Sequence, residues 1–239
     1  MPTALTRARR SALRRARVSA VGTAFHLYLD SAELSELRTC LPHPLIHGVT
    51  TNPTLLKRAG IGRAALPALL QTAIELGAKQ VQAQVTAAQT DAMLEDAERL
   101  LRPFERGQLV VKIPATRDGL RAGAQLSARG VPVTYTAVYV LEQAHFAVQL
   151  GAAYAAPYLG RLQDAGVDGL ALIAQMQSLL GGSATRLLVA SVRSREAYLA
   201  LLRIGVGAVT IPPRLFAELV DHDATLAAER DFLADAGVA

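Results

Sequence analysis

The sequence has a single cysteine, no tryptophan and no long uninterrupted apolar segment. One cysteine, Cys40, excludes an intramolecular disulfide and fits a reducing compartment. A lone cysteine in a proline-containing loop is far more often inert than catalytic, so we expect no chemistry from Cys40. No apolar run approaches the ~20 residues that a membrane helix needs, and no secretory signal is visible. These absences predict a cytoplasmic protein with no membrane partner.

Acidic residues are absent from residues 1–24, which hold six arginines: Arg7, Arg9, Arg10, Arg14, Arg15 and Arg17. Such a segment resembles an organellar transit peptide, a basic arm for an anionic partner, or a disordered extension. We favour a disordered basic tail, because the Ala- and Arg-rich usage with three lysines in the whole chain is typical of GC-rich bacteria. Without the tail the formal net charge falls from +5 to −1. Residues 25–239, expected to form one domain, show no basic stripe with interleaved aromatics, so we expect no nucleic-acid partner.

Short apolar segments alternate with helical patterns from residue 26 onwards. The expected strands are 26–30, 48–52, 80–85, 109–114, 132–138, 154–158, 186–191 and 208–212. These segments are apolar nearly throughout, as at 109–111, which is typical of parallel strands covered on both faces. Eight such units in one domain predict an α/β fold of the (β/α)8 TIM-barrel class. An open doubly wound sheet is the alternative, weakened because no G-x-G-x-x-G follows the first strand.

Helical patterns fill the spaces between the strands. The expected helices are 32–39, 62–76, 89–101, 118–128, 141–150, 167–180, 194–202 and 214–220, with an extra C-terminal helix at about 224–234. Gly77, Gly130 and Gly151 follow helical runs, as glycines that end helices do. Asp118 and Ser194 are suited to begin the helices that follow them.

Lys112 is the most informative residue of the chain, because it lies inside the apolar strand 109–114. A buried ammonium is costly, and desolvation favours the neutral amine, which is a nucleophile toward carbonyl groups. The alternative is a strand-end lysine that reaches solvent or pairs with Asp30. Asp, Asn, Thr and Tyr at the neighbouring strand ends favour a catalytic lysine, since active sites of such barrels lie at the C-terminal ends of strands.

Arg161, Ser191 and Arg193 follow the sixth and seventh expected strands. Guanidinium groups and hydroxyls suit a phosphate, and late loops of barrels are a common phosphate site. They could equally be solvent-facing loop residues.

The five histidines show no metal-ligand spacing, so no metal site is expected.

Seven motifs in order resemble the transaldolase family. They are Leu-Tyr-Leu-Asp (27–30), Gly-Val-Thr-Thr-Asn-Pro (48–53), Ala-Gln-Val (83–85), Val-Val-Lys-Ile-Pro (110–114), Thr-Ala-Val-Tyr (136–139), Ala-Pro-Tyr-Leu-Gly-Arg (156–161) and Ala-Ser-Val-Arg (190–193). The similarity covers about residues 25–236 and is closer to the small-subunit branch that includes fructose-6-phosphate aldolase.

The resemblance implies a role for each matching residue. Lys112 would be the Schiff-base lysine, with Asp30, Thr50 and Asn52 holding the dihydroxyacetone unit and assisting proton transfer. Arg161, Ser191 and Arg193 would hold the phosphate, and Gln84, Thr136 and Tyr158 a catalytic water. It further implies sugar-phosphate substrates, no cofactor, and a ring-based homo-oligomer whose C-terminal helices pack between subunits. Residues 1–24 have no counterpart.

Two groups of residues point to different activities within the family. The segment Ala-Ser-Val-Arg (190–193) and Ile113 are transaldolase-like, whereas Gln84 and Tyr158 stand where transaldolases usually have Glu and Phe. The water-site residues favour a class I aldolase that cleaves fructose 6-phosphate to dihydroxyacetone and glyceraldehyde 3-phosphate. The alternative is a transaldolase that passes the dihydroxyacetone unit to erythrose 4-phosphate in the pentose phosphate pathway. More remote alternatives are a non-catalytic sugar-phosphate-binding barrel and an isomerase, which would need a carboxylate base where Lys112 stands.

Overall fold

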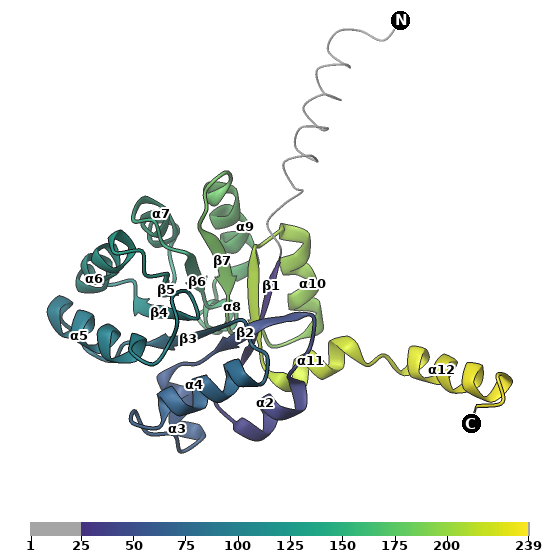
Figure 1. Cartoon of the computed structure of the whole chain (residues 1–239). Helices are drawn as coiled ribbons and strands as arrows, with labels where there is room; N and C mark the ends of the chain where they lie inside the picture. The colour runs from purple at the N-terminus through teal and green to yellow at the C-terminus, as the bar shows by residue number, and fades with distance from the viewer. Residues whose placement is uncertain (1–24, 239) are drawn as a thin grey trace, which may run out of the picture.

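The computed structural model describes residues 25–238 as a closed barrel of eight parallel strands in chain order (Figure 1). The barrel closes because β8 pairs with β1, with His26 opposite Ala208 and Leu29 opposite Ile211. The strands are β1 (His26–Asp30), β2 (Ile46–Thr50), β3 (Gln80–Gln84), β4 (Leu109–Pro114), β5 (Val133–Val138), β6 (Tyr154–Pro157), β7 (Arg186–Val189) and β8 (Ala208–Ile211). The predicted TIM barrel is thereby confirmed.

Helices surround the barrel and cover the outer face of the sheet (Figure 1). They are α2 (Leu34–Cys40), α3 (Pro53–Arg58), α4 (Leu66–Glu75), α5 (Thr90–Leu101), α6 (Arg117–Ala128), α7 (Leu141–Gln149), α8 (Leu159–Asp164), α9 (Gly169–Leu180), α10 (Arg195–Ile204), α11 (Pro213–Val220) and α12 (Asp223–Asp235). None of these helices is both long enough and apolar enough to cross a membrane. The tail that we predicted at residues 1–24 lies outside the described residues.

The outward-facing side chains of the strands and the inner faces of the helices form one large apolar core. A second, smaller cluster fills the interior of the barrel, with Tyr28, Val110 and Tyr154 among its buried members. Because successive residues of a strand alternate between the two faces, Tyr28 and Asp30 both point inward, as do Val110 and Lys112. The interior at and below the level of Lys112 therefore contains aromatic and apolar side chains, with the buried Gln82 among them.

The structure differs from the expected elements at several boundaries. Two short helices, α3 and α8, begin directly after strand ends, where we expected loops. Strand β2 lies at Ile46–Thr50 rather than 48–52. Helix α6 is capped by the Thr116 side chain, which accepts from the Gly119 amide, so the assignment of Asp118 as cap was wrong. Ser194 caps α10 as predicted, and Gly77, Gly130 and Gly151 adopt the left-handed conformation that helix-ending glycines favour.

The C-terminal helix α12 projects away from the barrel (Figure 1). It has no buried residue, and Phe232 is 71% exposed. Helix α12 therefore presents apolar side chains, Phe232 among them, on its exposed surface.

Candidate functional site

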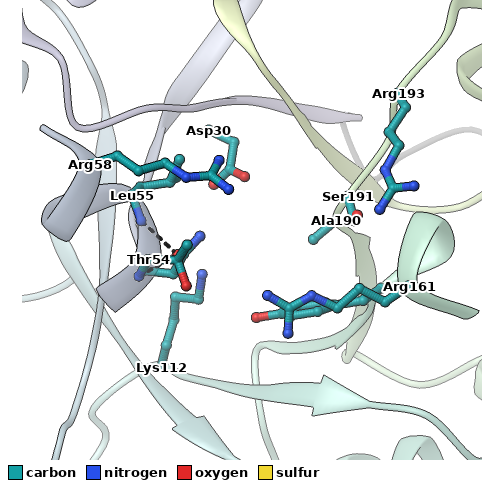
Figure 2. Close-up of a pocket in the computed structure, with 11 residues that line it drawn as sticks. Asp30, Thr54, Leu55, Arg58, Lys112, Arg161, Ala190, Ser191 and Arg193 are labelled. Atoms are coloured by element: carbon teal, nitrogen blue, oxygen red, sulfur yellow. Dashed lines mark hydrogen bonds between the residues drawn. The ribbon is translucent and has the colours of Figure 1, made fainter. Parts of the chain in front are cut away.

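A pocket of about 330 Å³ opens at the C-terminal ends of the strands. Figure 2 shows Lys112 and Arg58 on one side of this pocket, with Arg161 and Arg193 on the other. The remaining lining residues are Asp30, Asn52, Thr54, Leu55, Tyr158, Ala190 and Ser191. The pocket lies where barrel enzymes place their chemistry, and one carboxylate faces several cationic side chains there.

Lys112 is almost completely buried, with 3% of its surface exposed. Its Nζ donates a hydrogen bond of 2.8 Å to the main-chain carbonyl oxygen of Thr51. Thr51 follows β2, whereas Lys112 lies on β4, so the side chain reaches past β3 to the far strand end. Since the hydrogen-bond acceptor is a neutral carbonyl rather than a carboxylate, the amine is oriented without being neutralised by an ion pair.

Asp30 lies at the end of β1 in the same pocket. Burial raises the pKa of its carboxyl group above the usual range, while the Lys112 charge, a hydrogen bond from Thr50 and the Arg161 charge oppose that rise. The Thr50 hydroxyl donates to Asp30 Oδ1 over 2.8 Å and lies 2.6 Å from the Thr210 hydroxyl. Thr50 therefore holds the carboxylate from β2, and Thr210 on β8 holds the Thr50 hydroxyl.

Tyr158 lines the pocket, and its hydroxyl lies 2.7 Å from that of Thr136. The two residues stand at the ends of neighbouring strands, where β5 carries an irregularity between Thr136 and Val138. Ala137, between Thr136 and Val138, has a φ angle of 56°, a conformation that a non-glycine residue adopts at an energetic cost. Thr136 faces the barrel interior by ordinary strand alternation, as Thr134 does, and the bulge begins only after it.

Arg161 and Arg193 are held in different ways. Arg193 makes a bidentate ion pair with Asp164, with N–O distances of 2.7 and 2.6 Å. Arg161 has no ion pair with any of residues 25–238, and its guanidinium lies 4.9 Å from the centre of the Tyr158 ring. Within the described residues Arg161 thus has all of its guanidinium donors free, whereas Arg193 has committed two of its five to Asp164.

The backbone around Ser191 allows these side chains to come together. Ser191 has φ of 59°, which again is costly for a non-glycine residue and is common at functional sites. Gly160 donates its amide hydrogen to the Ser191 carbonyl oxygen over 3.0 Å. A Cβ at Gly160 would lie 2.6 Å from Arg193 Nε, so only glycine permits this approach.

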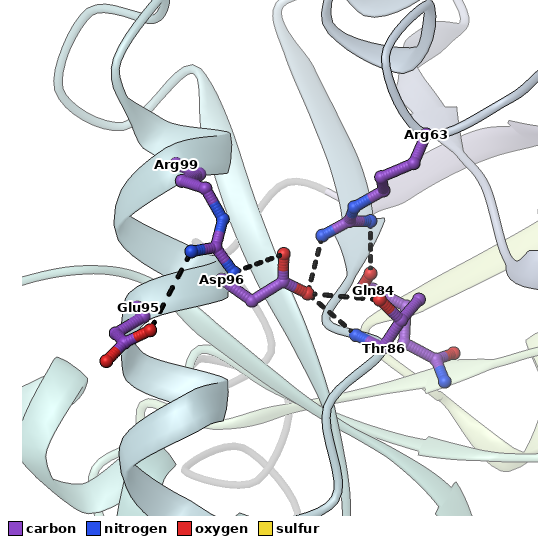
Figure 3. Close-up of polar contacts among 6 residues, drawn as sticks. All are labelled: Arg63, Gln84, Thr86, Glu95, Asp96 and Arg99. Carbon is purple, nitrogen blue, oxygen red and sulfur yellow. Dashed lines mark hydrogen bonds and ion pairs between the residues drawn. The ribbon is translucent and has the colours of Figure 1, made fainter.

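The end of β3 is fixed from outside the barrel by Arg63 (Figure 3). Its Nη1 donates to the Gln84 carbonyl oxygen over 2.9 Å, and its Nη2 lies 2.7 Å from Asp96. Burial alone would raise the pKa of Asp96, but the hydrogen bonds from Arg63 and Thr86 lower it below the usual range. The main chain at Gln84 is therefore anchored, although its side chain makes no hydrogen bond within residues 25–238.

Comparison with known proteins shows the family to which this geometry belongs. Residues 27–237 match the family model described as "Transaldolase/Fructose-6-phosphate aldolase". This chain belongs to that family. A relative from Coprothermobacter proteolyticus named "Probable transaldolase" is 34% identical over 210 residues, covering 87% of this chain and 94% of the relative. One from Desulfitobacterium hafniense with the same name is 35% identical over 209 residues, covering 87% and 96%.

A solved structure of 2,3-dimethylmalate lyase has a similar fold. Its TM-score is 0.58 at 15% sequence identity, with 95% of this chain and 88% of that chain covered. Identity this low supports the barrel architecture and carries nothing about the reaction. The family assignment rests on the family model and on the sequence relatives.

Most residues that the family resemblance singled out lie together in the structure. Seven of them line the pocket: Lys112, Asp30, Asn52, Tyr158, Arg161, Ser191 and Arg193. The Thr50 hydroxyl donates to Asp30 and the Thr136 hydroxyl is hydrogen-bonded to that of Tyr158, although neither threonine lines the pocket itself. Gln84 is opposite Lys112 in the strand register but does not line the pocket. Asn52 uses its side-chain oxygen to cap α3, accepting from the amides of Thr54 and Leu55 over 3.0 Å.

Sequence reasoning missed the residues that α3 contributes, namely Thr54, Leu55 and Arg58. The signal was present, because Asn-Pro is a strong helix start with Asn as the cap and Pro in the first turn. Ending the expected strand at 52 and starting the next helix at 62 left out the short helix that places Arg58 at the pocket. Thr210, the partner of Thr50, carried no signal beyond its position in β8.

Proposed function

We propose that the protein is a class I aldolase that cleaves and forms the C3–C4 bond of fructose 6-phosphate through a Schiff base on Lys112. The products of cleavage would be dihydroxyacetone and glyceraldehyde 3-phosphate. The observation that carries the choice of aldolase is the Thr136–Tyr158 hydroxyl pair, 2.7 Å apart, with Tyr158 lining the pocket that contains Lys112. Such a pair can bind a water molecule and exchange a proton with it.

In the first half of the reaction the neutral Lys112 amine attacks the C2 carbonyl; the resulting carbinolamine hydroxyl takes a proton from solvent and leaves as water, which gives a protonated imine. Asp30 takes the proton of the C4 hydroxyl, and the C3–C4 electron pair moves toward the imine as the aldehyde leaves. The raised pKa of Asp30 suits this role, because a carboxylate that is costly to keep charged accepts a proton more readily.

In the second half the enamine carbon must receive a proton, and water must then hydrolyse the imine. A water held by Thr136 and Tyr158 can deliver the proton, since either hydroxyl can donate or accept. Hydrolysis restores the free amine and releases dihydroxyacetone. On the other side of the pocket Arg161 and Ser191 would bind the phosphate, with Arg193 held in place by Asp164.

The second candidate is a transaldolase, in which the enamine attacks erythrose 4-phosphate instead of receiving a proton. It is favoured by the name given to the sequence relatives, "Probable transaldolase". Both reactions share the steps up to the enamine, so they differ in whether water or a second aldehyde reaches it first.

A product assay separates the candidates. The protein is incubated with fructose 6-phosphate alone, and free dihydroxyacetone is measured over time; a second reaction contains erythrose 4-phosphate and is assayed for sedoheptulose 7-phosphate. An aldolase releases dihydroxyacetone without an acceptor. Product only in the second reaction would replace the aldolase by the transaldolase. No product in either, with fructose 6-phosphate bound, would indicate a non-catalytic barrel. Lys112→Met is the control for contaminating activity.

A further inference from the structure

A second cavity, of about 510 Å³, opens at the opposite end of the barrel, where the strands begin. Its walls come from the starts of β3 and β7 and from the loops before β4, β5 and β6. The polar side chains that line it are those of Gln80, Arg106, Ser127 and Arg186. We call it the floor cavity. Its volume is within the range of small-molecule sites.

Arg186 is the central residue of the floor cavity. It is the first residue of β7 and is opposite the inward-facing Tyr154 in the register, so its side chain enters the barrel floor. Its stem packs where a Cβ at Gly207 would be, 2.9 Å from Arg186 Cγ. Its guanidinium forms no ion pair or hydrogen bond with any residue in 25–238, and the buried Nε has no partner. An unpaired buried donor destabilises the structure, and a ligand acceptor would recover that cost.

Two further groups in the floor cavity also lack partners. The buried Ser127 hydroxyl makes no hydrogen bond with the described part of the chain. Arg106 forms no ion pair there either, and its guanidinium lies against Gly130, where a side chain would collide with it. Gln80, by contrast, is satisfied, because its oxygen accepts from Tyr28 over 2.5 Å and its nitrogen donates to the Gly107 carbonyl.

The charge of the floor cavity is of one sign. No acidic side chain lines it, whereas two guanidinium groups do. The pocket around Lys112 differs in this respect, because it contains the Asp30 carboxylate beside its arginines. Guanidinium groups with free donors in a shaped, electropositive cavity match the oxygens of a phosphate. We propose that the floor cavity is a second ligand site, which binds a small phosphate-bearing anion between Arg106 and Arg186 with Ser127 as a further contact.

The floor cavity borders a network of aromatic side chains that can report on the ligand. His26 Nδ1 lies 2.7 Å from the Tyr154 hydroxyl, and the His26 and His47 rings stack with centroids 3.7 Å apart. The positive charge of Arg186 is one of the causes that lower the pKa of both histidines, after burial. An anion bound at Arg186 would offset that charge, so it should raise the pKa values of His26 and His47. This readout does not depend on catalysis.

The test uses the full chain carrying Arg161→Gln, which weakens phosphate binding in the pocket around Lys112. Orthophosphate is titrated at constant ionic strength, with the histidine ring signals followed by NMR and the heat by calorimetry. We expect saturable binding in the millimolar range or tighter, with shifts at His26 and His47. Adding Arg186→Gln or Arg106→Gln should weaken it at least about tenfold, the loss of one charge-assisted hydrogen bond.

Matched variants keep the outcome decisive. Arg129→Gln, on the neighbouring exposed surface and paired with Glu98, removes the same charge and should leave binding unchanged. Arg106 is on an exposed loop, so Arg106→Gln tests the site even where Arg186→Gln fails to fold. The proposal is overturned by an absence of saturable binding, by an equal response to chloride, or by binding that both cavity variants leave intact. None of these outcomes bears on the reaction at Lys112.

Discussion

The Nζ of Lys112 donates a 2.8 Å hydrogen bond to the main-chain carbonyl oxygen of Thr51, two strands away across the barrel. The bond positions the amine without an ion pair. It involves only one N–H group, so the rest of the nitrogen remains free to react. A protonated imine keeps one N–H, which can continue to donate to the same oxygen. The main chain of β2 can thus hold the nitrogen before and after the carbonyl is attached.

Covalent trapping is expected at Lys112 and at neither of the two other lysines. Borohydride added with dihydroxyacetone or fructose 6-phosphate should reduce the imine, add the mass of the ketose unit to the peptide containing Lys112, and abolish activity. Peptide mass spectrometry distinguishes this residue from Lys57 and Lys79, which are both exposed and do not line the pocket. Modification of either of those residues, or of none, contradicts the Schiff-base mechanism.

Tyr158→Phe should separate the release of dihydroxyacetone from its transfer. The variant removes the hydroxyl that pairs with Thr136 but keeps the ring on which Arg161 packs. Loss of acid–base assistance is worth about 10²–10⁴-fold, so the rate of dihydroxyacetone formation should fall by about that factor. Transfer to erythrose 4-phosphate should fall much less. Tyr139→Phe, on the neighbouring ring outside the pocket lining, is the matched control. Equal losses in both reactions would remove the water-site interpretation.

Acid should destabilise the protein through the stacked histidines at the barrel floor. Burial, together with the charges of Lys79 and Arg186, lowers the pKa of His47 to about 4, and His26 is lowered to about 4 by burial, His47, Arg186 and Lys79. Because the folded pKa lies below the ordinary value near 6.5, the unfolded chain binds protons first. The neutral pair therefore stabilises the fold above about pH 6.5, and this contribution is lost as the pH falls toward about 4.

Thermal unfolding of His47→Phe measures that effect. Phenylalanine keeps a ring to stack on His26 but cannot be protonated, so the fall in Tm between pH 7 and pH 4.5 should be shallower than in the parent protein. His145→Phe changes an exposed residue of α7 and serves as the control. An identical pH slope for parent and His47→Phe would show that the stacked pair does not govern the acid sensitivity.

The projecting helix α12 is expected to pack on another copy of the chain, as the family resemblance implies. The double variant Phe232→Asp, Leu233→Asp replaces two apolar side chains by charged ones. In the single chain Phe232 is 71% exposed and Leu233 is 45% exposed. Burial of these side chains between subunits would make the charges costly. Light scattering should then show a smaller assembly than the parent protein forms, with secondary structure unchanged by circular dichroism. An unchanged mass would place the oligomer contact elsewhere, or exclude one.

Much of the barrel could be predicted from local sequence signals, because its strands are continuous apolar runs separated by helical patterns. Prediction failed where an element was too short to give a recognisable sequence pattern. Helices α3 and α8 have six residues each and start at strand ends, so no apolar period could develop. Asp118 was preferred over Thr116 as a cap because both residue types cap helices, and only the backbone decides between them.

The candidate site was predicted by resemblance and by the positions of strand ends, but its contacts were not. Alternation along β5 and β6 turns Thr136 and Tyr158 inward, but the 2.7 Å distance between their hydroxyls depends on the strand register, which the pattern of a single strand does not encode. Arg193 and Arg161 look equivalent in the sequence. The ion pair between Arg193 and Asp164, the last residue of α8, joins residues 29 apart in the chain and distinguishes the two arginines in the structure.

The aromatic filling of the barrel interior also imposes an order on the proposed chemistry. Tyr28, Val110 and Tyr154 pack below Lys112, with 0%, 0% and 3% of their surfaces exposed, so substrates approach the amine through the mouth of the barrel. The first aldehyde must leave by that route before a second can enter. With two substrates the steady-state kinetics should therefore be ping-pong, with parallel double-reciprocal lines, and the departing aldehyde should compete with the incoming one for the same enamine form.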